Sequence, residues 1–161
     1  MSDRTKPNTQ QVARAGEHFA AAELHWRGAY AVVFSGNMPG IDVLVSDRRQ
    51  TRTVVLQVKT KTSGTWHTTI TRGRIRESVH DETRFWVFVD LAEQPPAFYV
   101  VPEWWIENDI HQEHQAYLAR HGGRRAQNPE SKHHGIPSGR VKEWRDRWEL
   151  LGVFDEQPSG D

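Results

Sequence analysis

Apolar residues in the first third of the chain follow a helical spacing. Residues 12–27 carry them at intervals of three and four, which predicts an amphipathic helix with one apolar stripe: Val12, Ala15, Phe19, Ala22 and Trp26. A second stripe of small residues on the same helix comprises Ala13, Ala20 and Leu24, and Glu17 lies within it. Gly28 is a suitable C-terminal stop. Residues 30–34 then predict a short strand.

A β-hairpin is the clearest local prediction. Residues 41–46 and 51–60 are rich in Val and Leu and flank a polar turn at 47–50, while residues 35–40 (SGNMPG) form a turn-rich loop before them. Because side chains alternate along a strand, Val54, Leu56 and Val58 should share one face. Gln57 and Lys59 should share the other. The continuous apolar content predicts that this hairpin lies inside a sheet, flanked by the helix of residues 12–27.

The rest of the chain adds strands and then helices. The pattern predicts a strand or an irregular crossing segment at 65–71, a short helix within 73–82, strands at 84–91 and 97–101, a helix from Pro102 to about 119, a long loop at 120–139, and a helical stripe of Val141, Trp144, Trp148 and Leu151. This order indicates an α/β fold with a central mixed sheet flanked by helices. We expect one domain over residues 9–154, with flexible tails at 1–8 and 155–161.

Composition narrows the chemistry. The 161 residues include no cysteine, which excludes disulfides, thiolate metal sites and cysteine nucleophiles. Lys plus Arg and Asp plus Glu both total 21, so net charge gives no argument for a nucleic-acid partner. The polar N-terminus lacks the apolar core of a signal peptide, and no apolar run is long enough to span a membrane. We therefore expect no membrane association and a cytoplasmic location.

Three residues of the predicted hairpin suggest a metal site. Asp42 opens one strand after a glycine-containing loop, while Gln57 and Lys59 share a face of the returning strand. The hairpin can bring a carboxylate, an amide oxygen and an ammonium group together. Oxygen ligands suit Mg²⁺, and an ammonium group can hold a phosphate or stabilise developing charge. The spacing is short, however, and fits equally well a hairpin with solvated polar residues on its outer face.

Three segments resemble a known family. Residues 16–24 (GEHFAAAEL) are similar to the first helix of PD-(D/E)XK nucleases, residues 39–45 (PGIDVLV) resemble their first motif strand, and residues 56–60 (LQVKT) resemble their second. The later strands and the segment with Trp144 and Trp148 resemble small bacterial members related to Holliday-junction-resolvase-like domains. This resemblance implies a restriction-endonuclease-like core.

The resemblance also implies roles for individual residues. Asp42 matches the metal-binding aspartate, Lys59 the motif lysine, and Glu17 the helical glutamate that closes the site, while Val58 would offer its backbone carbonyl. Gln57 stands where the family usually has Asp or Glu, and its amide oxygen can bind a metal without adding negative charge. Glu23 competes with Glu17 for the helical role, but Glu17 lies among alanines, where a sheet can approach closely. Mg²⁺ or Mn²⁺ is the expected cofactor.

The function that the resemblance implies is metal-dependent hydrolysis of DNA phosphodiester bonds, by an endonuclease or an exonuclease. Basic residues cluster in three places, although each cluster also fits an ordinary mixed-charge surface. The candidate nucleic-acid contacts are Arg48, Arg49, Lys61, Arg72, Arg74, Arg124, Arg125, Lys132 and His134. The partner would be DNA, with a second copy of the chain as a further candidate. The alternatives are an inactive nucleic-acid-binding or protein-interaction module of the same fold, and a zinc hydrolase that uses His111 and His114.

Overall fold

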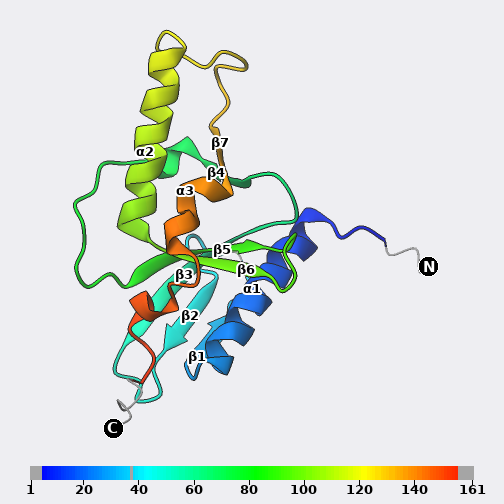
Figure 1. The fold of residues 1–161 in the computed structure, drawn as a ribbon, viewed down its shortest axis with the longest axis vertical. Coiled ribbons are helices and arrows are strands. Elements are labelled where there is room, and N and C mark those ends of the chain that lie inside the picture. Colours follow the sequence, from blue (N-terminus) through cyan, green and yellow to red (C-terminus); the bar gives the residue numbers. More distant parts are fainter. Residues whose placement is uncertain (1–4, 37, 156–161) are drawn as a thin grey trace.

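A five-stranded mixed sheet forms the centre of the protein (Figure 1). The computed structural model describes residues 5–36 and 38–155. The sheet has the order β1-β2-β3-β5-β6, and its strands are β1 (Tyr30–Val33), β2 (Val43–Ser46), β3 (Thr53–Lys61), β5 (Arg84–Asp90) and β6 (Ala97–Pro102). β3 and β5 run parallel, and the other neighbours are antiparallel. The predicted hairpin is therefore β2 and β3, inside the sheet.

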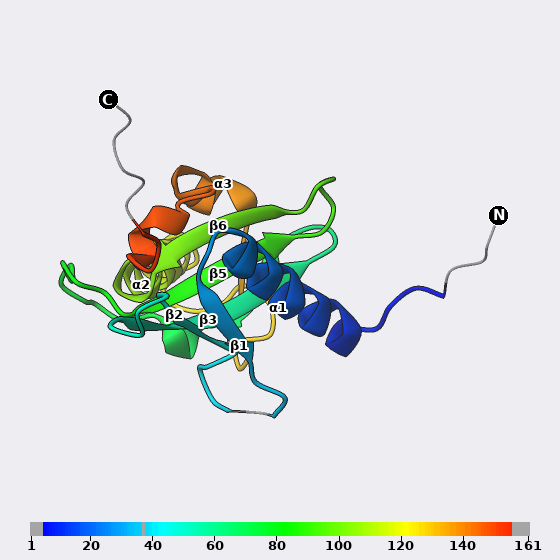
Figure 2. The same ribbon diagram turned by 90° about the horizontal axis from the view of Figure 1, so that it is seen from below.

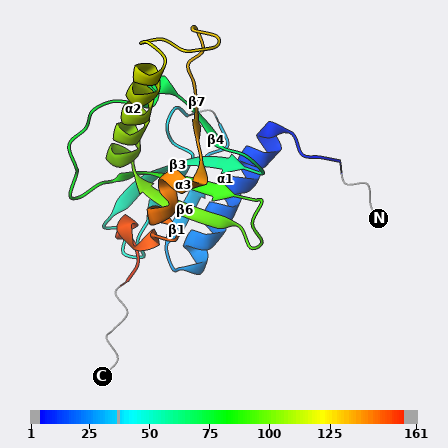
Figure 3. The same ribbon diagram turned by 45° about the horizontal axis from the view of Figure 1, so that its top comes forward.

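Helices and a small second sheet cover the two faces (Figures 2 and 3). Helix α1 (Thr9–Trp26) packs on one face, and α2 (Glu103–Arg120) packs on the other with the two-stranded sheet of β4 (Trp66–Thr69) and β7 (His133–Ile136). The remaining helical segments are η1 (Ile70–Arg72), α3 (Ser138–Val141), η2 (Lys142–Trp144) and η3 (Trp148–Leu151). The α/β architecture with a mixed sheet flanked by helices is confirmed. Among the described residues, neither long helix has an apolar stretch that could cross a bilayer.

Side-chain alternation along the strands builds two separate cores. Val54, Leu56 and Val58 of β3 lie in the core beneath α1, as predicted. Trp86 and Phe88 of β5 lie in the core beneath α2 and the β4–β7 sheet. Gln57 and Lys59 belong to this second face of β3 by strand parity. Gln57 and Lys59 therefore lie on the side of the sheet that carries α2, β4 and β7.

Helix α1 begins earlier than the apolar pattern predicts. The Asn8 side chain accepts a hydrogen bond from the Gln11 N–H, and the Gln11 side chain accepts one from the Asn8 N–H, so the two residues form a capping box. The helix consequently starts at Thr9, and Asn8 is its cap rather than part of a tail. The other residues of the predicted tails lie partly outside the described residues, at 1–4 and 156–161.

The buried face of α1 is not the face with the largest apolar residues. Phe19 is 44 % exposed and Trp26 is 89 % exposed, whereas Ala20 and Leu24 are fully buried. Phe19 and Trp26 of the predicted apolar stripe therefore face outward, and Ala20 and Leu24 of the small-residue stripe face the sheet. The reason is close packing: a Cβ atom at Gly16 would lie 1.8 Å from the Thr60 hydroxyl oxygen. Only a helix face of small residues can approach β3 so closely.

Two predictions for the middle and later chain are wrong. Residues 73–82 form no helix; instead their backbone is tied to α2, with the Arg74 N–H donating to the Glu107 carbonyl at 3.0 Å. The predicted loop at 120–139 contains β7 and the start of α3, and β7 pairs with β4 in antiparallel register. This pairing shows that β4 is a strand, one of the two alternatives for residues 65–71.

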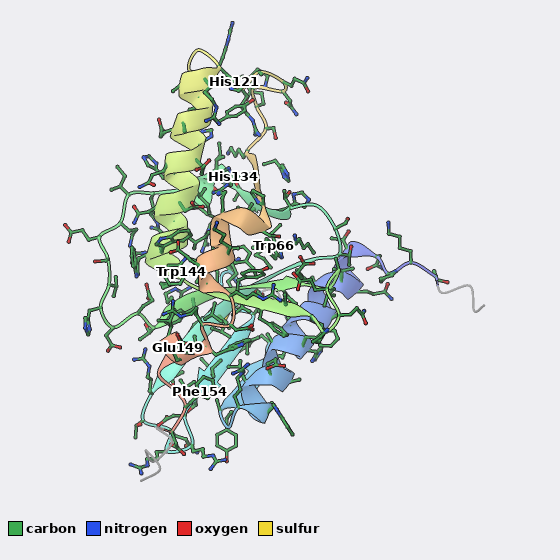
Figure 4. The ribbon with its side chains drawn as sticks, viewed as in Figure 1. Trp66, His121, His134, Trp144, Glu149 and Phe154 are labelled. Atoms are coloured by element: carbon green, nitrogen blue, oxygen red, sulfur yellow. The ribbon has the colours of Figure 1, made fainter. Side chains whose placement is uncertain are left out.

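The predicted C-terminal helix is three short segments, not one. Val141 of α3 lies in the core beneath α2, while Trp148 and Leu151 of η3 lie in the core beneath α1. Trp144 lies between them (Figure 4). It packs edge-on against Trp105 of α2, with ring centres 5.3 Å apart. The chain thus crosses from one face of the sheet to the other, which a single straight helix could not do.

Candidate active site

Asp42 is fixed at the point where β2 begins. Its N–H donates to the Leu56 carbonyl at 2.9 Å, and its Oδ2 accepts the Val58 N–H at 2.7 Å. The Asp42 carboxylate therefore accepts the backbone N–H of β3 that would pair with the backbone of β2 if that strand were longer. Because the N–H and C=O of one strand residue point to the same edge, the Val58 carbonyl also leaves β3 on the side of Asp42.

Three of the predicted site residues meet in one pocket. Glu17 from α1, Asp42 and Gln57 line a cavity of about 300 Å³. Arg14 and residues 36 and 38–40 of the loop between β1 and β2 complete its wall. Asn37 of the same loop lies outside the described residues. The order helix, turn-rich loop, hairpin thus brings together side chains from three segments of the chain.

Glu17 is held in place by an arginine that sequence reasoning missed. Its side chain is largely buried, and Arg14 lies 2.8 Å from its Oε2 while also donating to the Phe34 carbonyl at 2.9 Å. The signal was available, since residues three apart on a helix face each other. Glu23, the competing glutamate, pairs with Arg27 at 3.2 Å and lines a different groove together with Trp26. Glu17, and not Glu23, therefore shares a pocket with Asp42.

Gln57 lines the cavity and also contacts a cation. Its Oε1 accepts a hydrogen bond from Arg72 at 3.2 Å. The same guanidinium group lies 5.1 Å from the ring centre of Trp86 and 3.6 Å from a carboxylate oxygen of Glu103. Glu103 is almost fully buried and also pairs with Arg84 at 3.1 Å. A buried carboxylate on α2 thus positions Arg72 against Gln57.

Lys59 lies in a partly desolvated environment beside these residues. Burial lowers the pKa of Lys59, the Asp42 carboxylate opposes that shift, and Arg72 adds to it. The ammonium nitrogen also lies 5.7 Å from the ring centre of Trp86. Lys59 lines the groove beside the N-terminal end of α1 rather than the cavity of Asp42, so it flanks the carboxylates. A lysine with a lowered pKa can exchange a proton more easily than a solvated one.

The oxygen atoms at this pocket suit a hard divalent cation. Within residues 5–36 and 38–155, no cluster of three or more His, Asp or Glu side chains has the arrangement of a metal site, including around His111 and His114. The pocket instead offers two carboxylates and the amide oxygen of Gln57, with the Val58 carbonyl on the same edge of β3. Mg²⁺ takes oxygen ligands, keeps several waters and needs few protein groups. The donor set therefore fits Mg²⁺ or Mn²⁺.

Several predicted nucleic-acid contacts are already paired within the protein. Arg74 lies 2.8 Å from the buried carboxylate of Glu107. Arg72 is bound to Gln57 as described above. Arg125 donates to the backbone carbonyls of Ser131 and His133 and so shapes its own loop. Arg48, Arg49, Arg124 and Lys132 are exposed, while His134 is half-buried.

Lys61 has a structural environment that the sequence did not suggest. Its ammonium group is buried, lies 3.1 Å from Asp90, donates to the Ser138 hydroxyl at 2.6 Å and sits 4.3 Å from the ring centre of Trp66. Lys61 continues the alternation of Gln57 and Lys59, but at this end of β3 the Trp66 side chain and α3 cover that face. Lys61 is therefore a buried ion-pair residue rather than a surface contact for phosphate.

Comparison with known proteins establishes the fold. Neither a scan of protein-family models nor a sequence search of curated proteins finds a match. Among solved structures, the chain is similar to a bacterial homing endonuclease, with a TM-score of 0.51 over 91 % of this chain and 95 % of that one. The sequence identity is 14 %, so the similarity is one of fold. It agrees with the mixed sheet flanked by helices.

Proposed function

We propose that this protein is a metal-dependent nuclease of the PD-(D/E)XK type that hydrolyses phosphodiester bonds in DNA. The observation that carries the proposal is the pocket that Glu17, Asp42 and Gln57 line together, beside a lysine whose pKa burial lowers. Two carboxylates that line a cavity, with a lysine beside it, are suited to metal-assisted phosphoryl chemistry. The fold similarity to a homing endonuclease supports the same reaction class, as an argument from analogy.

Asp42 and Gln57 are the residues that we assign to metal binding, with the Val58 carbonyl and Glu17 at its periphery. A divalent cation held there would stabilise negative charge that develops on the scissile phosphate. Asp42 is already oriented by the Val58 N–H, so little rearrangement is needed to bind a cation. Glu17, fixed by Arg14, can orient a water molecule at the open side of the pocket.

Lys59 and Arg72 supply positive charge at the edge of this pocket. Lys59 can position the attacking water or take up its proton, because burial disfavours the charged ammonium form. Arg72 is oriented by Glu103 and can hold a phosphate oxygen with the donors that Gln57 does not use. These two cations are the groups that we expect to touch the substrate.

The second candidate is a nucleic-acid-binding module that has lost activity. The observation that favours it is the contact between Gln57 and Arg72. A neutral amide contributes no charge to a metal, and here its oxygen already accepts a hydrogen bond from a cation. In this alternative Arg72 occupies the side of the pocket that a metal would otherwise use, and the protein would bind DNA without cutting it.

An assay of DNA cleavage separates these functions. Supercoiled, linear and single-stranded DNA, with RNA as a comparison, would be incubated with the protein in Mg²⁺, in Mn²⁺ and in EDTA. The nuclease proposal predicts cleavage of at least one DNA form in a divalent metal, loss of cleavage in EDTA and a large decrease in Lys59→Ala. Binding of DNA with no cleavage in either metal would favour the inactive module.

A further inference from the structure

A second polar pocket lies between α2 and β7, apart from the candidate active site. It has a volume of about 230 Å³, and its wall includes His114 and Arg120 of α2, Arg125 of the following loop, His133 and His134 of β7, and Arg140 of α3. Ligand sites for drug-sized molecules are larger, at about 300–1,000 Å³. This pocket is therefore suited to a single small charged group.

Two of the arginines are held by fixed partners. Arg140 pairs with Asp109 of α2 and donates to the Gly135 carbonyl at 3.2 Å. It also lies 3.0 Å from Nε2 of His134. Because a guanidinium group only donates hydrogen bonds, that nitrogen of His134 must be unprotonated. Arg125 is anchored by the carbonyls of Ser131 and His133, which leave its charge uncompensated.

Burial and, to a smaller extent, the surrounding positive charge lower the pKa values of two histidines at the pocket. Burial, and then Arg140, His114, Arg125 and His133, lower the pKa of His134 to about 4. Burial, and then Arg125 and His111, lower the pKa of His114.

The acidic groups around the pocket are fewer than the basic ones. Asp109 forms an ion pair with Arg140. Glu113 is exposed and lines the pocket. The negative charge of Glu143 contributes to raising the pKa of Asp109. Three arginines, Arg120 of α2, Arg125 of the loop and Arg140 of α3, therefore converge on one small cavity, and Asp109 compensates only the charge of Arg140 directly.

We propose that this pocket binds a phosphate group of a nucleic-acid backbone. The identification of the source as nucleic acid rests on the proposed nuclease function. The pocket lies on the same side of the sheet as Gln57 of the candidate site: Ile70 of η1 lines the pocket, and Arg72, at the end of η1, donates to Gln57. One strand of nucleic acid could thus contact both the pocket between α2 and β7 and the candidate active site at Asp42.

Phosphate binding should be coupled to proton uptake. An anion in the pocket offsets the positive charge that lowers the pKa values of the two histidines, so both values should rise on binding. By linkage, the affinity for the anion should increase as the pH falls toward these pKa values. Sulfate is a useful probe because, unlike inorganic phosphate, it does not change protonation in this range.

Histidine ring signals in NMR spectra test the site directly. Titrations from about pH 8 to about pH 3, with and without sulfate and repeated with inorganic phosphate, should show upward pKa changes of about one unit for His114 and His134. The ring signals of His25 and His80, which lie elsewhere on the surface, are followed as controls. Unchanged pKa values of His114 and His134 at saturating sulfate would overturn the proposal.

A DNA-binding series decides whether the anion is a backbone phosphate. Arg120→Ala, at an exposed position, should lower duplex affinity about fivefold to tenfold and reduce the salt dependence by about one phosphate contact. Arg147→Ala, at an exposed position outside the pocket, is the matched control. The series is run without metal, so it does not depend on cleavage. If sulfate binds but Arg120→Ala leaves DNA affinity unchanged, the nucleic-acid assignment is wrong. If both effects are present but no DNA is cut, the nuclease function fails and the pocket stands.

Discussion

Replacing Gln57 with glutamate would add one negative charge to the candidate site with almost no change in side-chain shape. In the structure this side chain lines the pocket of Asp42 and Glu17, and its Oε1 accepts a hydrogen bond from Arg72 at 3.2 Å. The new carboxylate would therefore meet an attractive cation on one side and repulsive carboxylates on the other. A divalent metal would change that balance.

The expected magnitudes follow from these contacts. The wild-type bond already has a charged donor, Arg72, so Gln57→Glu turns a charge-assisted hydrogen bond into an ion pair, which should add about 0.2–1 kcal/mol. Repulsion from Asp42 opposes this gain, and the metal-free variant should differ from the wild type by no more than about 1–2 kcal/mol in stability. With metal, the added ligand charge should strengthen binding at least tenfold, or about 1.4 kcal/mol.

Calorimetric titration of Mg²⁺ and Mn²⁺ into Gln57→Glu and the wild type measures this difference, and melting curves in EDTA and in metal provide a second readout. Gln112→Glu on the exposed face of α2 is the matched control, because it adds the same charge outside the pocket. Equal metal affinities and equal metal-induced melting shifts for Gln57→Glu and the wild type would refute the assignment of residue 57 to the metal site.

Three further predictions concern the fold around the site. Leu24→Ala should cost about 2–5 kcal/mol in chemical denaturation, while Trp26→Ala should change stability by less than about 0.5 kcal/mol, and the reverse order would mean that the other face of α1 is buried. The pKa of His134 is lowered from 6.5 to about 4, so the folded state favours the neutral ring, and the protein should lose stability as the pH falls from 6.5 to about 4. With solvent screening, this loss is roughly 1–2 kcal/mol. Melting curves across this pH range should show the loss in the wild type and not in His134→Gln. Lys61→Met should cost about 3–5 kcal/mol, since it leaves the buried Asp90 carboxylate without its cation, and Asp90→Leu in the same chain should recover much of that loss in urea unfolding; full stability of the single variant would contradict the buried ion pair.

The β2–β3 hairpin was predictable because all the determining information is local. Alternation of side chains placed Val54, Leu56 and Val58 on the apolar face, and the structure confirms it. The closeness of Asp42 to β3 follows from the antiparallel register, in which Val43 is opposite Leu56. This part of the candidate site can be predicted from two local features, the turn and the alternation of side chains along the strand.

The orientation of α1 was not predictable from the apolar pattern because two stripes competed. The larger stripe, with Phe19 and Trp26, has more apolar surface, yet the smaller stripe is buried. The close approach of Gly16 to Thr60 decides between them, and that contact joins residues far apart in the sequence. The same packing places Glu17 in the pocket.

Contacts between distant segments account for the remaining differences. β7 pairs with β4 across more than sixty residues, and its sequence, HHGI, has no strand-like apolar pattern. The pairings of Arg72 and Arg74 with Glu103 and Glu107 likewise depend on where α2 docks. The sequence therefore indicates that these arginines are basic candidates for a phosphate contact, but it does not show that they form ion pairs with carboxylates of α2.

The most direct test of the central claim compares two substitutions of the same kind in one DNA-cleavage assay. Asp42→Asn keeps an oxygen that can accept the Val58 N–H but removes the charge from the pocket, whereas Asp81→Asn removes a charge from an exposed residue paired with Arg52. With Mg²⁺ or Mn²⁺, the account predicts that the wild type and Asp81→Asn cut DNA at similar rates. Asp42→Asn should be slower by about a hundredfold or more, since it loses a metal ligand. Cleavage by Asp42→Asn at the wild-type rate, or no cleavage by the wild type in either metal, would contradict the account.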